Sequence, residues 1–451
     1  MKKSKAHMNI VLLSGGSGKR LWPLSNEVRS KQFIKIFKTD NTIEGDNSTY
    51  ESMLQRVYRQ IKSVDQYAAI TIATSKSQVS AIHNQIGAGV SVSVEPCRRD
   101  TFPAIALATA YLHDIQRVSA EDAVVVCPVD SYVDNDYFVA LKRLWELAQK
   151  DTVNLVLMGI KPTYPSEKYG YIIPITKEDV SKVSTFKEKP DEETAKTYIA
   201  QGGLWNGGVF AYKLKYVLER AHQLIDFTDY YDLFNKYDTL TKISFDYVVV
   251  EHEPDIAVMR FNGQWKDLGT WNTLTEAMEE NVIGDVRLNE KCQNVHVINE
   301  LGIPFLAMGL KNIVISASPE GILVSDKEQS DQIKPFVESI NQQVMFAEKS
   351  WGNFRILDVG KESLTVKVTL NPGQRMNYHS HDRRDEIWTI ISGCGRTIVD
   401  GMEQPVKAGD VITMQAGCKH TIIASSKLNL IEVQLGQDIS VTDKHKFELE
   451  F

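Results

Sequence analysis

The chain of 451 residues is 43% apolar and 24% charged, and its formal net charge at pH 7 is -7. This length corresponds to about three domains, and the composition is that of an ordinary globular protein. The net negative charge argues against a broad surface for nucleic acid or anionic lipid, and no apolar run reaches the roughly 18 residues of a membrane span.

The chain begins with the basic and then apolar run MKKSKAHMNIVLL. The apolar part stops at Gly15 without a small-residue cleavage site, so it does not resemble a signal peptide. The five cysteines include no Cys-x-x-Cys pair, which argues against a disulfide framework and against a zinc knuckle. These features predict a protein of the reducing cytoplasm, with neither nucleic acid nor a membrane among its partners.

From residue 9 to about residue 283, strand patterns alternate with helical patterns. Short apolar runs predict buried strands over residues 10–13, 70–73, 123–127 and 155–158. Helical spacing predicts helices over residues 49–61, 103–118 and 137–149. This alternation is typical of an α/β domain with a mostly parallel sheet, whose ligands bind outside the carboxyl ends of the strands.

The stretch LLSGGSGKRLWPLSNEVRSKQF, residues 12–33, combines a glycine-rich loop with cations directly after the first predicted strand. A Walker loop would need Gly in place of Leu13 and Ser or Thr in place of Arg20, and a dinucleotide fingerprint would need Gly in place of Leu21. Glycines nonetheless let backbone N–H groups approach an anion, and Lys and Arg add charge-assisted hydrogen bonds. The stretch therefore predicts a phosphate-binding loop, against the alternative of a surface turn with solvated cations.

Polar motifs follow at the ends of strands or in turns: EPCRRDTFPA, CPVDSYV, KYGYI, FKEKP, WNGGVF, SFDYVVVE and WKDLGTW. We expect Asp100 or Thr101 to cap the helix of the first motif, and WNGGVF to place Asn206 on a turn. Singly, Asp130 could be a turn residue and Asp267 a helix cap. Together with the cationic loop, two carboxylates at strand ends indicate a site for Mg²⁺ and a triphosphate, because Mg²⁺ is usually held by one or two carboxylates and by phosphate oxygens.

The pattern changes near residue 290. The strand-like runs VHVI, IPFLAMGL, NIVISA and GILVS are separated by Asn, Gly and Pro without helices between them, and the polar run DKEQSDQIKPF that follows them has a helical pattern. This part resembles a small β-coil linker. From Trp351 onward, strands and turns alone predict a barrel or jelly roll.

Two motifs in this last part match the spacing of cupin jelly rolls. They are PGQRMNYHSHDRRDEIWTIISG and GDVITMQAGCKH, in which Gln415 replaces the usual Pro. They supply three histidines and a carboxylate: His379, His381, Glu386 and His420. Such a set suits a divalent first-row metal such as Zn, Mn or Co. The alternative is a jelly roll whose histidines are merely packed.

Taken in order, the glycine loop and the motifs that follow it resemble those of the mannose-1-phosphate guanylyltransferases, within the sugar-nucleotide pyrophosphorylase superfamily. The resemblance runs over residues 9–451. It implies an α/β fold whose Rossmann-like (GT-A-like) nucleotidyltransferase domain covers residues 9–285. A short β-helix-like linker would follow over residues 286–345, and a C-terminal cupin jelly roll similar to phosphomannose isomerase over residues 346–451.

The resemblance also assigns roles to individual residues. It implies nucleotide binding by Gly15, Gly16, Ser17, Gly18, Lys19 and Arg20. It implies catalytic roles for Arg20 and Lys31 on the triphosphate, for Asp130 and Asp267 as Mg²⁺ ligands, and for Lys189 on the sugar phosphate. It implies a sugar pocket formed by Tyr169, Gly170, Glu188, Lys189, Asn206 and Asp246.

The implied reaction forms GDP-mannose and pyrophosphate from GTP and mannose 1-phosphate, by Mg²⁺-assisted in-line attack of the sugar phosphate on the α-phosphate. A homodimer is a candidate assembly. The chain departs from the family pattern at Ser30, where Pro is common, at Lys19, where Thr is usual, and at Val129-Asp130-Ser131, which replaces Ser-Asp-His. None of these changes removes a charged group with an assigned role. Two alternatives stay open: another sugar 1-phosphate such as a heptose, and a non-catalytic sensor of sugar phosphates.

A third alternative is a bifunctional enzyme with mannose-6-phosphate isomerase activity in the cupin. Bifunctional relatives carry a cluster like HHHRAEHW, where this chain has HSHDRRDEIW. Arg384 matches the Arg of the family and His381 its first His, but Asp382 and Arg383 replace the other two. We therefore expect the cupin to bind a metal, with His379 as a ligand, and to show weak isomerase activity or none.

Overall fold

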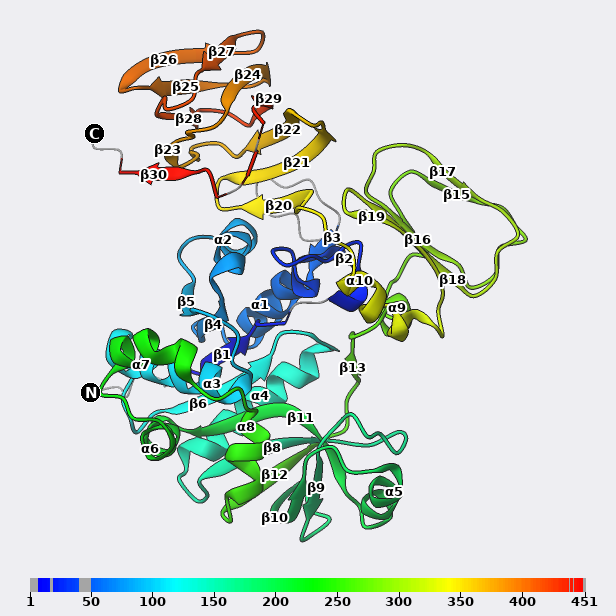
Figure 1. Ribbon diagram of the computed structural model, residues 1–451. Coiled ribbons are helices and arrows are strands. Elements are labelled where there is room, and N and C mark those ends of the chain that lie inside the picture. Colours follow the sequence, from blue (N-terminus) through cyan, green and yellow to red (C-terminus); the bar gives the residue numbers. More distant parts are fainter. Residues whose placement is uncertain (1–6, 17–18, 40–49, 438, 441, 449–451) are drawn as a thin grey trace. The chain divides into compact units, whose positions relative to one another are not determined.

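The computed structural model describes residues 7–16, 19–39, 50–437, 439–440 and 442–448. The chain divides into two compact units, both of which contain more than one segment of the chain (Figure 1). The first unit comprises Met1–Gly18, Lys31–Val79 and Gly89–Glu279, and the second comprises Lys19–Ser30, Ser80–Ala88 and Glu280–Phe451. Among the described residues, no helix is both long enough and apolar enough to cross a membrane.

The first unit is built around a sheet with the strand order β5-β4-β1-β6-β11-β8-β12-β10-β9 (Figure 1). In chain order these strands are β1 Asn9–Leu13, β4 Ala69–Ser75, β5 Ser91–Glu95, β6 Ala123–Pro128, β8 Leu155–Ile160, β9 Tyr171–Pro174, β10 Val180–Lys187, β11 Leu204–Lys213 and β12 Ile256–Phe261. β5, β4, β1 and β6 are parallel to one another, and β8 is parallel to β12. The sheet is mostly parallel, as predicted, because only β10 and β11 run against the other strands: β11 lies antiparallel between β6 and β8, and β10 is antiparallel to β12 and β9.

Helices cover this sheet, which confirms the α/β prediction. The helices of the first unit are α1 Met53–Val64, α3 Thr101–Ala110, α4 Asn135–Gln149, α5 Glu192–Ala200, α6 Leu214–Leu224, α7 Tyr230–Lys236, α8 Phe245–Val248 and α9 Trp271–Thr275. Strands β6 and β8 are apolar and almost fully buried, as expected for strands that are covered on both faces. α4 packs on β6 and β8, and α3 packs on β4. Val126, Leu157 and Phe210 lie in the resulting core.

Two helices begin or end at residues other than those predicted, because local hydrogen bonds set their boundaries. The helix predicted from residue 49 begins only at Met53, because β3 (Tyr50–Ser52) pairs with β2 (Lys35–Lys38) and Ser52 then caps α1 in a capping box with Gln55. The predicted cap at Asp100 is confirmed, since its side chain accepts a hydrogen bond from the backbone N–H of Thr101. The helix predicted over residues 103–118 continues beyond α3 as one wider turn, Tyr111–Ile115.

The second unit contains a stack of short strands after residue 280. They are β14 Val282–Ile283, β15 Val286–Leu288, β16 His296–Asn299, β17 Phe305–Ala307, β18 Ile313–Ser318 and β19 Gly321–Asp326. β14, β16 and β18 are parallel, and β15 is parallel to β17, around a small apolar core that includes Val297 and Ile315. Short parallel strands that stack on one another are the arrangement expected of a β-helix-like segment. The helical pattern after them forms a 3₁₀ turn, Ser330–Gln332, and the short helix α10 (Lys334–Glu338).

The last part of the chain folds into two antiparallel sheets, as expected for a jelly roll (Figure 1). One sheet, in the order β20-β21-β22-β29-β24-β27, contains β20 Phe346–Lys349, β21 Gly352–Val359, β22 Ser363–Leu370, β24 Asp385–Ser392, β27 Val411–Met414 and β29 Leu428–Leu435. The other, in the order β26-β25-β28-β23-β30, contains β23 Tyr378–Ser380, β25 Cys394–Val399, β26 Met402–Lys407, β28 His420–Ala424 and β30 His445–Phe447. Their core includes Val368, Trp388 and Leu430 from one sheet and Ile422 from the other.

Two earlier segments of the chain also belong to the second unit. Within segment Lys19–Ser30, Arg29 makes two hydrogen bonds to the Glu300 carboxylate, at 2.8 and 2.9 Å. Asn26 donates a hydrogen bond from Nδ2 to Glu320 at 2.8 Å. The other segment contains most of α2 (Val79–Ile86). The cations Lys19 and Arg20, which follow the glycine loop in sequence, therefore lie on a segment whose described contacts include residues far along the chain.

Candidate active site and candidate metal centre

Two carboxylates and a lysine meet at one edge of the first unit. Lys31 begins a 3₁₀ turn, Asp130 follows β6, and Asp267 ends β13 (Trp265–Asp267), which pairs with β7 (Ser131–Val133). The Nζ atom of Lys31 lies 2.7 Å from Oδ2 of Asp130 and 3.8 Å from Oδ1 of Asp267. The side chains of Asp130 and Asp267 keep 37% and 43% of their surface exposed, so both are accessible to a ligand. The structure thus brings together three residues that lie far apart in the sequence.

Lys31 keeps the carboxyl group of Asp130 ionised. Removal from water would by itself raise the pKa of Asp130, but the charge of Lys31 and its hydrogen bond outweigh this effect, and the pKa of Asp130 is lowered. Asp130 is therefore ionised at neutral pH. Ionised carboxylates with exposed oxygens are the protein ligands that Mg²⁺ prefers, and the residues present fit that ion.

A cavity of about 210 Å³ opens beside this junction. It is lined by Pro128, Asp130, Ser131, Lys168, Tyr169, Gly170, Glu188, Asn206, Gly207, Gly208, Asp246, Trp265 and Asp267. The sequence motifs pointed to most of these residues. Trp265 has a further property that the motifs do not reveal: its indole N–H is buried and has no hydrogen-bond partner among the described residues.

Asn206 sits in an irregular part of β11. The pairing of β11 with β8 shifts its register between Asn206 and Phe210, so the predicted turn is instead a bulge within a continuous strand. The Asn206 side chain donates to Oδ1 of Asp246 at 2.6 Å and accepts from the backbone N–H of Gly208 at 3.1 Å. Gly208 has a φ of 68°, a conformation that glycine adopts without strain. The bulge therefore fixes the orientation of the Asn206 amide inside the cavity.

Glu188 and Lys189 form an ion pair at the end of β10. The Nζ atom of Lys189 lies 2.7 Å from Oε1 of Glu188, which is 7% exposed. The φ of Lys189 is 44°, in the left-handed region that lysine rarely adopts, and such strain is often found at functional sites. A Cβ atom at Gly170 would lie 2.5 Å from Oε2 of Glu188, so only glycine leaves space for this carboxylate.

Two titratable groups in this region have shifted pKa values. Burial and the negative charge of Glu188 raise the pKa of Asp246 to about 7, against the opposing effect of the hydrogen bond from Asn206. Burial acts to lower the pKa of Lys189, but the hydrogen bond and the charge of Glu188 outweigh it and the pKa is raised. Lys189 is therefore a cation at neutral pH beside a carboxyl group that titrates near neutrality, and strongly shifted groups of this kind cluster at functional sites.

Only part of the predicted glycine loop can be placed. Gly15 and Gly16 follow β1 after Ser14, whereas Ser17 and Gly18 lie outside the described residues. Gln78 donates a hydrogen bond to the backbone oxygen of Gly16 at 3.3 Å, and a Cβ at Gly15 would touch Oε1 of Glu95 at 3.4 Å.

Gln32 and Gln78 support this loop, although sequence reasoning gave them no role. Gln32 donates to Oγ and to the backbone oxygen of Ser14, both at 3.0 Å, and to Oε1 of Gln78 at 3.3 Å. Both glutamines are 2% exposed or less. Only their polarity at buried positions could have revealed them, and burial is not visible in a single sequence.

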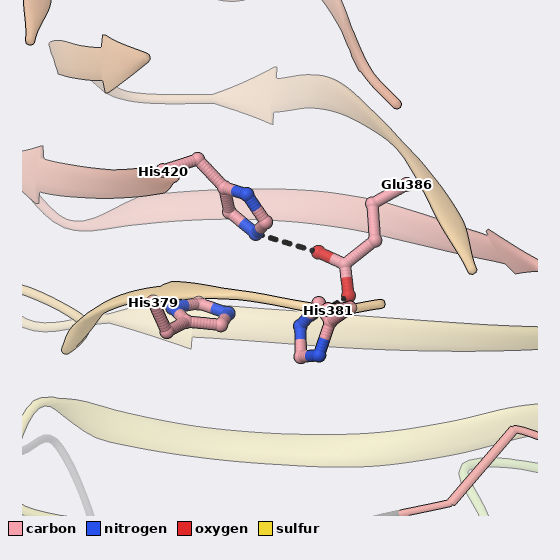
Figure 2. Close-up of side chains that lie close together, drawn as sticks. All are labelled: His379, His381, Glu386 and His420. Atoms are coloured by element: carbon pink, nitrogen blue, oxygen red, sulfur yellow. Dashed lines mark hydrogen bonds and ion pairs between the residues drawn. The ribbon is translucent and has the colours of Figure 1, made fainter. Parts of the chain in front are cut away.

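Three histidines and a carboxylate meet inside the jelly roll, as the cupin motifs predict (Figure 2). His379 lies on β23, His381 just after it, Glu386 on β24 and His420 on β28. Their exposed fractions are 2% or less, and their ligand atoms all lie within 4.8 Å of one another. The Glu386 carboxylate lies 3.0 Å from Nε2 of His381 and 3.1 Å from Nε2 of His420.

The second nitrogen of each imidazole shows which atom is free to bind a metal. Nδ1 of each ring faces a backbone oxygen: Asn377 for His379, at 2.6 Å, Asp443 for His381, and Cys418 for His420, at 3.0 Å. A carbonyl oxygen only accepts, so Nδ1 of a neutral ring carries the proton and its Nε2 keeps a lone pair. Such outer hydrogen bonds are usual for histidines that bind metals. The four residues therefore fit a divalent cation.

Arg384 adds a positive charge to this cluster. Its Nη2 lies 3.1 Å from Nε2 of His381, and its Nε donates to Oε1 of Glu386 at 3.2 Å. Donation by Arg384 is consistent with a lone pair on Nε2 of His381. Burial, together with the nearby charge of Lys444, lowers the pKa of His379 to about 2, so that this ring is neutral at physiological pH.

Known proteins share both parts of the chain. A family model described as nucleotidyl transferase matches residues 9–282, and one described as mannose-6-phosphate isomerase C-terminal matches residues 338–449. The chain is 28% identical to mannose-1-phosphate guanylyltransferase ManC of Salmonella typhimurium over 479 residues, which cover 97% of each chain. It is also 28% identical to the mannose-1-phosphate guanylyltransferase of Escherichia coli K12 over 478 residues, again with 97% of each chain covered.

Two further proteins are similar to this chain. The xanthan biosynthesis protein XanB of Xanthomonas campestris pv. campestris is 28% identical over 475 residues, which cover 97% of each chain. The crystal structure of a mannose-1-phosphate geranyltransferase from Thermus thermophilus superposes with a TM-score of 0.60 at 26% identity. That superposition covers 74% of this chain and 98% of the other.

Proposed function

Because the chain belongs to the nucleotidyl transferase family, we propose that it forms GDP-mannose and pyrophosphate from GTP and mannose 1-phosphate. The observation that carries the proposal is the junction of Lys31, Asp130 and Asp267, whose two carboxylates line a cavity. The near full-length similarity to guanylyltransferases of Salmonella and Escherichia coli supports the choice of these two substrates.

The proposed reaction must bring two anions together, because the phosphate of the sugar attacks the α-phosphate of the nucleotide. At about 4 Å, two unit charges repel each other by roughly 4 kcal/mol at an effective dielectric constant near 20. Asp130 and Asp267 would hold Mg²⁺, which when bound neutralises phosphate oxygens. Lys31, already between these carboxylates, would contribute its ammonium group to the triphosphate. Phosphoryl transfer depends mainly on such positioning and charge neutralisation.

The polar cavity would hold the sugar phosphate. Glu188 and Asn206 would bond sugar hydroxyls, and Asp246 would hold the Asn206 amide in place through their 2.6 Å hydrogen bond. Tyr169 would line the pocket beside Gly170, whose missing side chain leaves room for Glu188. Lys189, whose backbone is strained two residues after β10, would neutralise the phosphate of the sugar.

The nucleotide would be bound by the glycine loop and the cations that follow it in sequence: Gly15, Gly16, Ser17, Gly18, Lys19 and Arg20. Backbone N–H groups can approach phosphate oxygens where no Cβ intervenes. Arg20 would bond the triphosphate, since guanidinium groups donate two parallel hydrogen bonds to phosphate. A homodimer stays the candidate assembly.

A matrix of nucleoside triphosphates against sugar 1-phosphates, with released pyrophosphate as the readout, tests the proposal. We expect the highest kcat/KM for GTP with mannose 1-phosphate. A higher value for a heptose 1-phosphate would change the substrate and keep the reaction class. Binding of both substrates without any turnover would instead favour a non-catalytic sensor.

We propose that the cupin binds a divalent transition metal (Zn, Mn or Co) through His379, His381, Glu386 and His420. Isomerisation of mannose 6-phosphate is the second candidate function, and the complete ligand set favours it. Against it, the carboxylates of Asp382 and Asp385 add negative charge near a dianionic substrate, each worth about 1 kcal/mol at close range even in high dielectric.

A coupled assay with mannose 6-phosphate and added Mn²⁺, Zn²⁺ or Co²⁺ distinguishes the two possibilities. We expect little or no fructose 6-phosphate. Brisk formation that disappears in His381→Ala would instead make the cupin an active isomerase.

A further inference from the structure

One of the three histidines of the proposed metal site is held by a remote part of the chain, whereas the other two are held locally. His379 and His420 are held at Nδ1 by backbone oxygens only two residues away, those of Asn377 and Cys418. His381 is held by the backbone oxygen of Asp443, 62 residues further along the chain. We name residues 442–447 the C-terminal clasp. The orientation of His381 therefore depends on a segment that is remote in sequence.

The side chain of Asp443 holds the same loop a second time. Its Oδ1 accepts a hydrogen bond from the backbone N–H of Asp382 at 3.0 Å, and its Oδ2 accepts one from that of Arg383 at 3.1 Å. These two residues directly follow His381. Asp443 is 4% exposed, so water competes little for these bonds. A single residue thus fixes both the ring of His381 and the backbone beside it.

The clasp also contacts the strand that carries another ligand. β30 pairs with β23, with His379 opposite Lys446 and Ser380 opposite His445. The clasp therefore adjoins two of the four ligand positions, one through the strand pairing and one through Asp443.

We propose that Asp443 is a positioning residue of the cupin metal centre and that closure of the C-terminal clasp is coupled to metal binding. The inference rests on the proposed metal site. The Asp443 carbonyl keeps the proton of His381 on Nδ1, which leaves Nε2 for the metal, and its carboxylate fixes the direction from which that ring enters the site. Since coupling between two equilibria is reciprocal, bound metal must stabilise the closed clasp as much as the clasp stabilises bound metal.

Metal titration of the full-length protein tests this coupling. The protein, stripped of metal, is titrated with Co²⁺ and with Zn²⁺ against a competing chelator. Asp443→Ala keeps the backbone carbonyl that faces Nδ1 of His381, but it removes both carboxylate hydrogen bonds that hold the loop after His381. Loss of outer-shell partners usually weakens metal binding about 10- to 100-fold, and we expect a loss near the lower end of this range, with a changed visible spectrum of bound Co²⁺. Asp443→Asn keeps an acceptor oxygen and should recover part of the affinity.

His445→Ala is the matched control within the clasp. It removes the ion pair between His445 and Asp382, at 2.9 Å, in which both side chains are more than half exposed. Exposed pairs contribute little, so we expect metal affinity within about twofold of the wild type. Asp382, Asp443 and His445 also form an outer group that could itself hold a metal. A loss in His445→Ala as large as that in Asp443→Ala would place the metal there and overturn the proposal.

Hydrogen exchange of the clasp amides gives an independent readout. We expect Zn²⁺ to slow exchange over residues 442–447 in the wild type, and to slow it less in Asp443→Ala. Unchanged Co²⁺ affinity in a folded Asp443→Ala would overturn the proposal. If that variant does not fold, the wild type alone tests the proposal. The proposal would then be overturned if Zn²⁺ left the exchange of the clasp amides unchanged. A wild type that binds no metal would refute the proposed metal centre itself, and that result appears before any variant is made.

Discussion

Lys31 lies between two carboxylates, Asp130 and Asp267, that are equally acidic in isolation but differ in their contacts. Asp130 makes a 2.7 Å ion pair, whereas Asp267 is 3.8 Å from the same ammonium group. Asp267 is also the more exposed of the two, and it ends a strand rather than packing in the core. A change at Asp267 should therefore affect chemistry more than folding.

Asp267→Asn should reduce the rate of pyrophosphate release at least 100-fold, because it removes a proposed Mg²⁺ ligand and leaves the fold intact. The measurement is kcat at saturating GTP, mannose 1-phosphate and Mg²⁺, with circular dichroism to monitor the fold. Asp179→Asn is the control, since Asp179 pairs with Arg143 at the surface of the same unit. Near-normal turnover in Asp267→Asn would exclude its role as a metal ligand.

Lys189→Ala should raise the KM for mannose 1-phosphate about tenfold or more, with a smaller effect on the KM for GTP. The reason is that Lys189, paired with Glu188 beside the cavity, is proposed to neutralise the phosphate of the sugar. Lys196→Ala is a suitable control, because Lys196 forms only an exposed ion pair with Glu192. An effect confined to the GTP parameter would assign Lys189 to the other substrate.

Asp246→Asn should raise the thermal stability of the ligand-free first unit at pH 8 and have little effect near pH 4. The folded-state pKa of Asp246, about 7, exceeds the ordinary value for an aspartate, so the folded state binds more protons between these values. Stability attributable to this group therefore falls as the pH rises from about 4 to about 7, and the amide removes that penalty while it keeps an acceptor for Asn206.

Differential scanning calorimetry of the two proteins across this pH range measures the difference. A gain of about 1–3 kcal/mol at pH 8 is expected, less than the full shift would give because the group is partly solvated. A constant difference at all pH values would show that the charge of Asp246 is not responsible.

Among the structural elements, segment Lys19–Ser30 shows how side chains far apart in sequence stabilise an irregular part of the chain. Arg29 is 9% exposed and makes a bidentate pair with Glu300, while its guanidinium group lies 5.1 Å from the centre of the Phe346 ring. Burial acts to lower the pKa of Arg29, but Glu300 outweighs it and the pKa is raised. A buried cation that lost this partner would be costly.

Glu300→Ala should therefore destabilise the second unit by about 2–4 kcal/mol, because it leaves the charge of Arg29 buried without its main partner. Urea unfolding followed by hydrogen exchange of peptides from this unit provides the measurement. Glu338→Ala is the matched control, since Glu338 forms an exposed i,i+4 pair with Lys334 and should change stability by less than about 0.5 kcal/mol. Equal effects of the two variants would contradict the assigned importance of the Arg29 pair.

The sequence predicted some elements well and others poorly, for physical reasons. Buried strands such as β6 and β8 follow from their apolar runs, and the cupin ligands follow from motif spacing within one small fold. The bulge at Asn206 could not be predicted from the sequence, because it depends on how β11 pairs with β8. The left-handed backbone of Lys189 could not be predicted either. The contacts between Arg29 and Glu300 could not, because a pair 271 residues apart has no local signal in the sequence.

At the scale of the whole molecule, the two candidate sites are built from different compact units. The residues that line the cavity beside the Lys31 junction all belong to the first unit, and His379, His381, Glu386 and His420 all belong to the second. A ligand stabilises the state that binds it, by an amount set by its concentration relative to its Kd. Each ligand should therefore stabilise mainly the unit that binds it.

We expect GTP with Mg²⁺ to slow hydrogen exchange mainly in peptides of the first unit, around Asp130 and Asp267, and Zn²⁺ to slow it around His381 and His420. Exchange after equal labelling times, with each ligand separately and with both, provides the comparison. At 100 times its Kd, a ligand adds about 2.7 kcal/mol of stability, which is easily detected. Protection by Zn²⁺ around Asp267 and not around His420 would contradict the assignment of the two sites.

The Lys31 junction has a consequence for how substrates arrive. The carboxylates of Asp130 and Asp267 favour a cation beside them, so a triphosphate that arrives with its divalent ion should enter this junction more readily than an uncomplexed one. If Asp130 and Asp267 held the divalent ion, they would no longer need the Lys31 ammonium group as their counter-ion, and Lys31 would be available to the phosphates. The Lys31 ammonium group would therefore be the counter-ion of the two carboxylates before substrates bind and of the triphosphate afterwards.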